Sequence, residues 1–266
     1  MMLRALAEAT PAVALGAVCL LGLVVGSFLN VVIARLPERR SLWRPRSACP
    51  RCGTPIAWYD NLPLLSFALL RGRCRACAMS ISWRYPVVEA LTGAAFLTAY
   101  AAFGPTARFV VAAALLAALI AITAIDLQLQ IIPNAITLPG IVAGVLANLG
   151  TGAVSWRDAV IGVLVGGGVF VAIILGYALV FREEGMGLGD AKLGAMLGAF
   201  LGWRALFFSL FVAVTVGGVL AIVLLATGLR GRKDPIPFGP FLALGGATGL
   251  FWGEKVVAWY LSGFGG

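Results

Sequence analysis

The stretch at 185–202, GMGLGDAKLGAMLGAFLG, decides the fold class because it places one acid, Asp190, between a glycine-rich turn and an apolar run. Such a run is too hydrophobic for the surface of a soluble domain. Of the 266 residues, 61% are hydrophobic and only 12% are charged, whereas soluble domains carry roughly 25% charged residues. The sequence therefore predicts a membrane protein.

Apolar segments close to the ~20 residues that a helix needs to cross a bilayer recur along the chain. The long ones are 12–33, 87–103, 108–125, 159–181, 205–228 and 239–262, and two shorter ones are 136–149 and 191–203. We expect an all-α polytopic membrane protein with about eight transmembrane helices. Its expected parts are a first transmembrane helix in residues 1–33, a loop domain in 34–86 and a transmembrane core in 87–266.

The positive charge is unevenly distributed. Half of the 20 Lys and Arg residues lie between Arg35 and Arg84, and basic residues collect in cytoplasmic loops of membrane proteins. We therefore expect this loop to face the cytoplasm. The net charge of +9 is explained by this topology, so the expected surroundings are the lipid bilayer and no nucleic-acid partner is predicted.

Two C-x-x-C pairs lie in the polar loop: Cys49 with Cys52, and Cys74 with Cys77. Each pair can direct two sulfurs at one ion, and four thiolates complete the tetrahedral shell of structural Zn²⁺. A closed shell leaves no position for an activated water, so the zinc would stabilise the loop. Two disulfides or redox pairs are the alternative, which a reducing cytoplasm disfavours.

The chain contains no histidine. This excludes Ser-His-Asp and Cys-His catalytic arrangements and the H-E-x-x-H zinc hydrolases. Proton transfer near neutral pH must then use carboxylates, lysine, tyrosine or a thiol.

Two of the 11 acids border apolar runs: Asp126 follows 121–125 and Asp190 opens the run after the glycine-rich turn. The expected topology places both on the cytoplasmic side at similar depth, so they can meet. A carboxyl pair that shares one proton can perform aspartic-protease chemistry without metal or histidine. The structural alternatives are a solvated helix end for Asp126 and an N-cap for Asp190.

Three neighbours of Asp190 are supporting candidates. Gly187 and Gly189 allow the backbone to approach a substrate or an opposing helix closely. Lys192 is expected either to stabilise the carboxylate or to extend toward the lipid headgroups.

These motifs, in this order, resemble those of the bacterial type IV prepilin peptidases, membrane aspartic proteases of the G-x-G-D group. The resemblance covers nearly the whole chain, through GSFLNVVIARLP (26–37), CPRC, CRAC, RYPVVE (84–89), AIDLQLQIIPNAITLPG (124–140), GMGLGDAKLGAMLGAFLG (185–202) and PFGPFLALGG (237–246). One departure is Asn134, where many relatives have a second aspartate; Asp126 remains as the acid of that segment.

The resemblance implies that Asp126 and Asp190 are the catalytic pair. It also implies that the substrates are prepilin or pseudopilin precursors, whose short basic leader is removed at the cytoplasmic face of the bacterial inner membrane, for a type IV pilus or a type II secretion system. It further implies that the four cysteines belong to a cytoplasmic domain of bifunctional members, which N-methylate the new N-terminus with S-adenosylmethionine. No G-x-G-x-x-G turn after a strand identifies a cofactor pocket, so the cofactor-binding residues are unknown.

Two other functions fit parts of the pattern. A cation- or proton-coupled transporter would use Asp126 and Asp190 as its ionisable relay, but it would be expected to show inverted repeats, and none is found. An assembly factor would use the zinc loop as a docking platform, with both acids inert. Cleavage of a pilin precursor distinguishes the protease from both.

Overall fold

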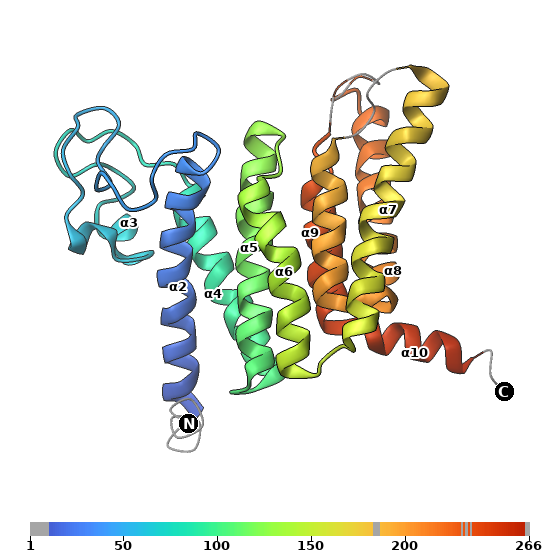
Figure 1. Ribbon diagram of the computed structural model, residues 1–266. Helices are drawn as coiled ribbons and strands as arrows, with labels where there is room; N and C mark the ends of the chain where they lie inside the picture. Colours follow the sequence, from blue (N-terminus) through green and yellow to red (C-terminus); the bar gives the residue numbers. More distant parts are fainter. Residues whose placement is uncertain (1–10, 183–186, 230, 232–233, 235, 264–266) are drawn as a thin grey trace. The chain divides into compact units, whose positions relative to one another are not determined.

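The computed structural model describes residues 11–182, 187–229, 231, 234 and 236–263. Within these ranges it is helical, and β pairing is limited to two isolated bridges, Ala48 with Pro55 and Arg73 with Ser80. The helices are α2 (Pro11–Arg35), η1 (Trp58–Asn61), α3 (Leu65–Leu69), α4 (Arg84–Phe103), α5 (Ala107–Leu129), α6 (Asn134–Thr151), α7 (Trp156–Phe181), α8 (Leu188–Ala226), α9 (Gly239–Thr248), η2 (Gly249–Gly253) and α10 (Glu254–Ser262). The expected all-α fold is confirmed (Figure 1).

Among the described residues, six helices are long and apolar enough to cross a membrane: α2, α4, α5, α6, α7 and α8. The chain is therefore a multi-pass membrane protein. The expected segments 191–203 and 205–228 both lie in α8, which has a non-helical residue at Gly202, and segment 239–262 is divided among α9, η2 and α10. The number of eight spans is not confirmed and stays a prediction, and residues 1–10 of the first expected segment lie outside the described ranges.

The chain divides into two compact units, Met1–Ala121 and Ile122–Gly266, with the boundary inside α5. The first unit holds α2, the loop that contains the cysteines, and α4. The second holds the end of α5 and the helices from α6 to α10.

In the first unit, α2 and α4 pack closely through a G-x-x-x-G pattern, Gly22 to Gly26. A Cβ at Gly22 would lie 2.8 Å from Gly93 Cα, and a Cβ at Gly26 would lie 2.7 Å from Glu89 Cα. Small residues allow membrane helices to approach in this way, because lipid provides no hydrophobic force to bring them together.

Two buried polar side chains strengthen this pair of helices. Asn30 on α2 donates from Nδ2 to the Tyr85 carbonyl oxygen of α4 at 3.1 Å. Glu89, which is 8% exposed, accepts at Oε2 from the backbone N–H of Leu64 at 2.8 Å. The second bond attaches the loop to α4 immediately before α3 begins.

In the second unit, α7 and α8 run side by side (Figure 1). A Cβ at Gly162 or Gly166 of α7 would collide with the carbonyl oxygen of Gly198 or Gly194 of α8. The two backbones are therefore in direct contact, and the first half of α8, which carries Asp190, is held firmly against α7.

Helix α8 breaks at Gly202, whose φ of 72° and ψ of 166° are not helical. A break removes the N–H donors that the preceding carbonyl groups would meet, and bare carbonyl groups are costly in a membrane. Asn148 of α6 provides donors, because its Nδ2 bonds to the carbonyl oxygens of Ala199 at 2.9 Å and Phe200 at 3.1 Å. The helix carrying Asp190 is thus also anchored to α6.

Candidate functional site

Asp126 lies three residues before the end of α5, in the second unit. Its side chain is only 4% exposed, so the alternative of a solvated helix end is wrong. Its Oδ2 accepts a hydrogen bond from the backbone N–H of Gly239 at 3.0 Å. Its other carboxylate oxygen receives no hydrogen bond from the described part of the chain.

Gly239 is a contact that the sequence did not predict. It is the first residue of α9, where the N–H has no partner within the helix, and so it can bind a carboxylate. A Cβ at this position would lie 2.6 Å from Asp126 Oδ2, so a larger residue would have to displace the carboxylate from its present position. The signal was the Gly239-Pro240 pair before an apolar run, which marks a helix start.

Asp190 lies in the first turn of α8. Gly187, not Asp190, takes the N-cap position, so capping does not explain the acid. The carboxyl groups of Asp190 and Asp126 are close enough to interact electrostatically. The structure therefore brings together two acids that are remote in sequence.

The two glycines before Asp190 have different surroundings. A Cβ at Gly189 would lie 2.9 Å from Ile132 Cβ, so this glycine allows α8 to begin directly against the segment that follows α5. A Cβ at Gly187 would meet nothing closer than the Gly189 nitrogen at 3.9 Å, and its φ of −79° is ordinary for any residue. Close packing is thus confined to Gly189.

Lys192 donates from Nζ to Asn134 Oδ1 at 2.9 Å. The bond joins the first turn of α6 to the start of α8. Asn134 is the position at which the family resemblance predicts a second aspartate. Lys192 therefore bonds to an asparagine at a position where many relatives have an aspartate. The contact holds the two helix starts on either side of Ile132 together.

The four loop cysteines converge in the first unit. Their sulfurs, of Cys49, Cys52, Cys74 and Cys77, all lie within 4.8 Å of one another, and the Sγ atoms of Cys49 and Cys77 are 3.7 Å apart. Tetrahedral Zn²⁺ with Zn–S bonds of about 2.3 Å requires sulfurs about 3.8 Å apart. None of the four is in a disulfide. They can therefore hold a metal ion.

Each C-x-x-C pair lies in a tight turn of the same form. The N–H of Gly53 donates to the Cys49 carbonyl oxygen at 2.9 Å, and the N–H of Ala78 donates to that of Cys74 at 2.9 Å. Gly53 and Ala78 both have positive φ, 70° and 55°. The repeated turn presents two sulfurs from each pair to one point.

Local hydrogen bonds favour the thiolate form of one of the four cysteines. Hydrogen bonds with Thr54, mainly with its side chain and secondly with its backbone, lower the pKa of Cys52 to about 6. The thiolate is the form that binds metal, so this cysteine is ready to do so at neutral pH.

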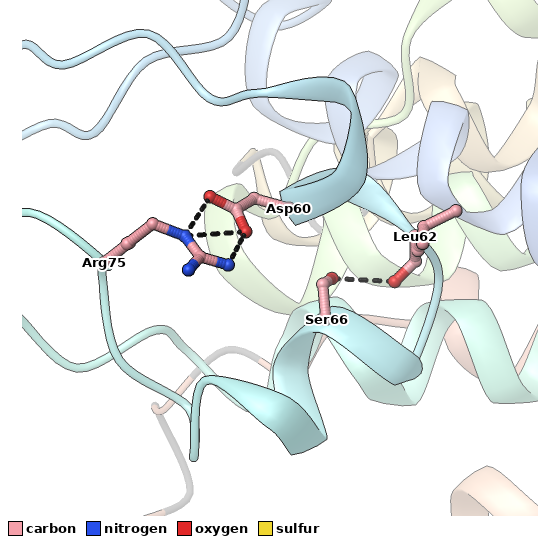
Figure 2. A network of polar contacts seen from close by, with 4 residues as sticks. All are labelled: Asp60, Leu62, Ser66 and Arg75. Carbon is pink, nitrogen blue, oxygen red and sulfur yellow. Dashed lines mark hydrogen bonds and ion pairs between the residues drawn. The ribbon is translucent and has the colours of Figure 1, made fainter.

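A salt bridge braces the turn that carries the second pair. Figure 2 shows the Arg75 guanidinium facing the Asp60 carboxylate of η1, with Nη2 to Oδ1 at 2.6 Å and Nε to Oδ2 at 2.9 Å. This two-point contact lowers the pKa of Asp60 below its usual range, so the acid is ionised at neutral pH. The figure also shows the Ser66 hydroxyl donating to the Leu62 carbonyl oxygen at 2.7 Å, which holds the start of α3.

Comparison with known proteins identifies the family. Residues 20–103 match the bacterial peptidase A24 N-terminal domain, and residues 113–222 match the type IV leader peptidase family. A prepilin leader peptidase/N-methyltransferase of Aeromonas salmonicida (strain A449) is 42% identical over 98% of each chain. Proteins of the same name from Burkholderia pseudomallei (strain 1026b) and Myxococcus xanthus (strain DK1622) are 42% and 49% identical over 88% and 80% of this chain, and over 84% and 64% of their own.

No solved structure matches this chain. The sequence relatives establish the family, because the matches cover the loop with its cysteines as well as both segments that carry the paired acids. This chain belongs to the type IV leader peptidase family.

Proposed function

We propose that this chain is a membrane aspartic endopeptidase that removes the short basic leader from type IV prepilin or pseudopilin precursors. The observation that carries the proposal is that Asp126 and Asp190 lie in one unit and interact electrostatically, the first buried and the second in the first turn of its helix. Family membership supports it, because the relatives are named prepilin leader peptidase/N-methyltransferase.

The reaction needs only the two carboxyl groups and water. The ionised carboxylate takes a proton from water while the water oxygen bonds to the peptide carbonyl carbon. The protonated carboxyl group donates a hydrogen bond to the carbonyl oxygen. The C–N bond then breaks, and the leaving amine receives the proton that the first carboxylate had taken. The chain has no histidine to compete for this role.

The neighbouring residues position this pair. The Gly239 N–H holds one oxygen of Asp126, and the other oxygen would take part in the reaction. Gly189 and the bond between Lys192 and Asn134 set where α8 begins, and hence where Asp190 lies. Gly187 provides the open turn that precedes the helix.

The membrane setting fits the substrate. A pilin precursor has an apolar helix behind a charged leader, so its scissile bond lies at the membrane surface. Asp126 and Asp190 lie at the end of one apolar helix and the beginning of another, which is where such a bond would arrive. We place this site and the cysteine loop on the cytoplasmic face of the bacterial inner membrane, because basic loops collect there.

In this proposal residues 34–86 form a loop domain built around one zinc ion, and 87–266 form the peptidase core that follows the first helix in 1–33. The sulfur spacing supports zinc. With four protein ligands the ion would be structural and would supply no activated water. It would replace the apolar core that so short and arginine-rich a loop lacks.

A second activity is proposed from the relatives' name, which includes N-methyltransferase. The chain would methylate the new N-terminus with S-adenosylmethionine as the methyl donor. No described contact marks a binding site for this cofactor. The transporter alternative is not supported, because the relatives found are named as peptidases.

The test is to incubate the purified full-length protein in detergent with a pilin precursor and to identify the products by mass spectrometry. We expect a leader peptide and a shortened pilin. When S-adenosylmethionine is present, the pilin should be heavier by about 14 mass units, the mass added by one methyl group. An intact precursor, with a protein that is folded and monodisperse, would contradict the proposal.

A further inference from the structure

An open depression of about 1010 Å³ lies in the first unit, outside the acid pair and the cysteine cluster. Its walls come from α3, from the turn after it and from the first turn of α4. The residues that matter for its chemistry are Phe67, Ala68, Arg71, Arg73, Trp83 and Pro86.

The turn that carries the two arginines is held by backbone bonds. The Gly72 N–H donates to the Phe67 carbonyl oxygen at 2.8 Å, and the Ile81 N–H donates to the Gly72 carbonyl oxygen at 2.7 Å. Gly72 has a φ of 65°, and a Cβ there would lie 3.0 Å from the Phe67 ring. The backbone of Arg71 and Arg73 is thus fixed beside an aromatic wall.

The depression lies where a membrane helix begins. Pro86, in its wall, is in the first turn of α4, one of the helices that can cross a membrane. The buried Glu89, one turn further along, bonds to the Leu64 N–H and attaches the opposite wall to the same helix. A helix of 20 residues is about 30 Å long, the thickness of the hydrocarbon core. The depression therefore lies at the end of a helix that is long enough to cross the bilayer.

Its lining combines positive charge with aromatic surface. Arg71 and Arg73 are exposed, and neither forms an ion pair with a described residue, in contrast to Arg75 with its partner Asp60. The described residues that line the depression include no acid. Phe67 and Trp83 pack with ring centroids 4.9 Å apart, and Trp83 is 73% exposed. Tryptophan and arginine together are typical of the membrane interface.

We propose that this depression binds the headgroup of an anionic phospholipid. The guanidinium groups of Arg71 and Arg73 would bind the phosphate, which suits their planar donors. Phe67 and Trp83 would contact the glycerol and the upper acyl chain. A basic leader peptide would be repelled by the same arginines. S-adenosylmethionine carries a positive sulfonium, and the described residues of the lining include no carboxylate to receive it. The proposal does not depend on the peptidase activity.

The test measures binding of short-chain phosphatidylglycerol to the full-length protein in a neutral detergent by native mass spectrometry. Replacing both arginines, Arg71→Gln with Arg73→Gln, should weaken binding about tenfold or more. The matched control is Arg39→Gln with Arg46→Gln, which removes the same charge from exposed positions of the same loop outside the depression. The control should bind nearly as the parent does.

A second variant keeps the charge and fills the space. Ala68→Trp should weaken lipid binding while the thermal unfolding midpoint and metal content stay close to the parent. Equal loss of binding in the control pair would show a diffuse charge effect and overturn the site. Competition by glycerol phosphate at the same concentration as the lipid would assign the depression to a soluble phosphate. Loss of S-adenosylmethionine binding in Ala68→Trp would assign it to the cofactor; either result contradicts the lipid proposal.

Discussion

The backbone N–H of Gly239 donates to Asp126 Oδ2 at 3.0 Å, across 113 residues of sequence. The bond exists because α9 begins at Gly239, where an N–H is free, and because no Cβ occupies the space beside the carboxylate. It fixes the orientation of one member of the acid pair from a third element of the second unit. The proposed transfer of a proton from water to this pair depends on that orientation.

Gly239→Ala should reduce cleavage about a hundredfold, because a methyl group 2.6 Å from Oδ2 must displace the Asp126 carboxylate, and a displacement of about 1 Å can cost that much. Initial rates of precursor cleavage measure the effect. Gly176→Ala on α7 is the matched control, since a Cβ there meets nothing within 4 Å. Equal activity in the two variants would show that the contact does not position the acid.

The two glycines before Asp190 should respond differently to the same change. Gly189→Ala forces the start of α8 away from Ile132, which lies 2.9 Å from the new Cβ, and should lower the cleavage rate about tenfold. Gly187→Ala should be close to neutral, because its surroundings are open and its φ is ordinary. A larger loss at Gly187 than at Gly189 would contradict this assignment and point to substrate contact at Gly187.

Lys192→Met should lower the cleavage rate less than about fivefold, because an exposed polar contact contributes little. Asn134→Asp should preserve activity, since the new carboxylate accepts from the same ammonium group. Comparison of kcat and KM for both variants checks this. If Lys192→Met abolishes cleavage in a folded protein, the lysine acts on the substrate or on Asp190 directly.

Cys49→Ser should remove about one zinc per chain, because four thiolates form one tetrahedral site. Metal analysis of the purified protein measures this. Cys19→Ser, which changes the cysteine of α2 outside the cluster, is the control and should keep the metal. We expect cleavage to continue weakly in Cys49→Ser, because the cluster lies in the first unit and both acids lie in the second. An unchanged zinc content would place the metal elsewhere.

Much of the fold could be predicted from sequence because its signals are local. Apolar length identifies membrane helices directly, and two C-x-x-C pairs describe their own turns. The number of spans could not be fixed, because α8 breaks at Gly202, near the boundary between the expected segments 191–203 and 205–228, and hydropathy does not show whether each part crosses the bilayer. In a bilayer the residues on both sides of such a break are apolar, so no alternation of apolar and polar residues marks it.

The two acids stood out because charge near an apolar run is rare, and the structure brings them into one unit. Gly239 did not stand out, since its contribution is a backbone N–H and an absent side chain. Glu89 was missed for a different reason: its partner, the N–H of Leu64, belongs to a loop whose path the sequence does not reveal. Contacts that the backbone makes between residues far apart in the sequence cannot be predicted from residue types alone.

The most direct measurement is the cleavage rate of a pilin precursor by Asp126→Asn and by Asp190→Asn, each purified in detergent and checked for folding by its unfolding midpoint. Asparagine keeps the shape of each side chain but can neither accept the proton from water nor share one. We predict that each variant loses about 10³-fold or more of the activity, while zinc content is unchanged. Cleavage by either variant within a few fold of the parent rate would contradict the assignment of these two acids as the catalytic pair.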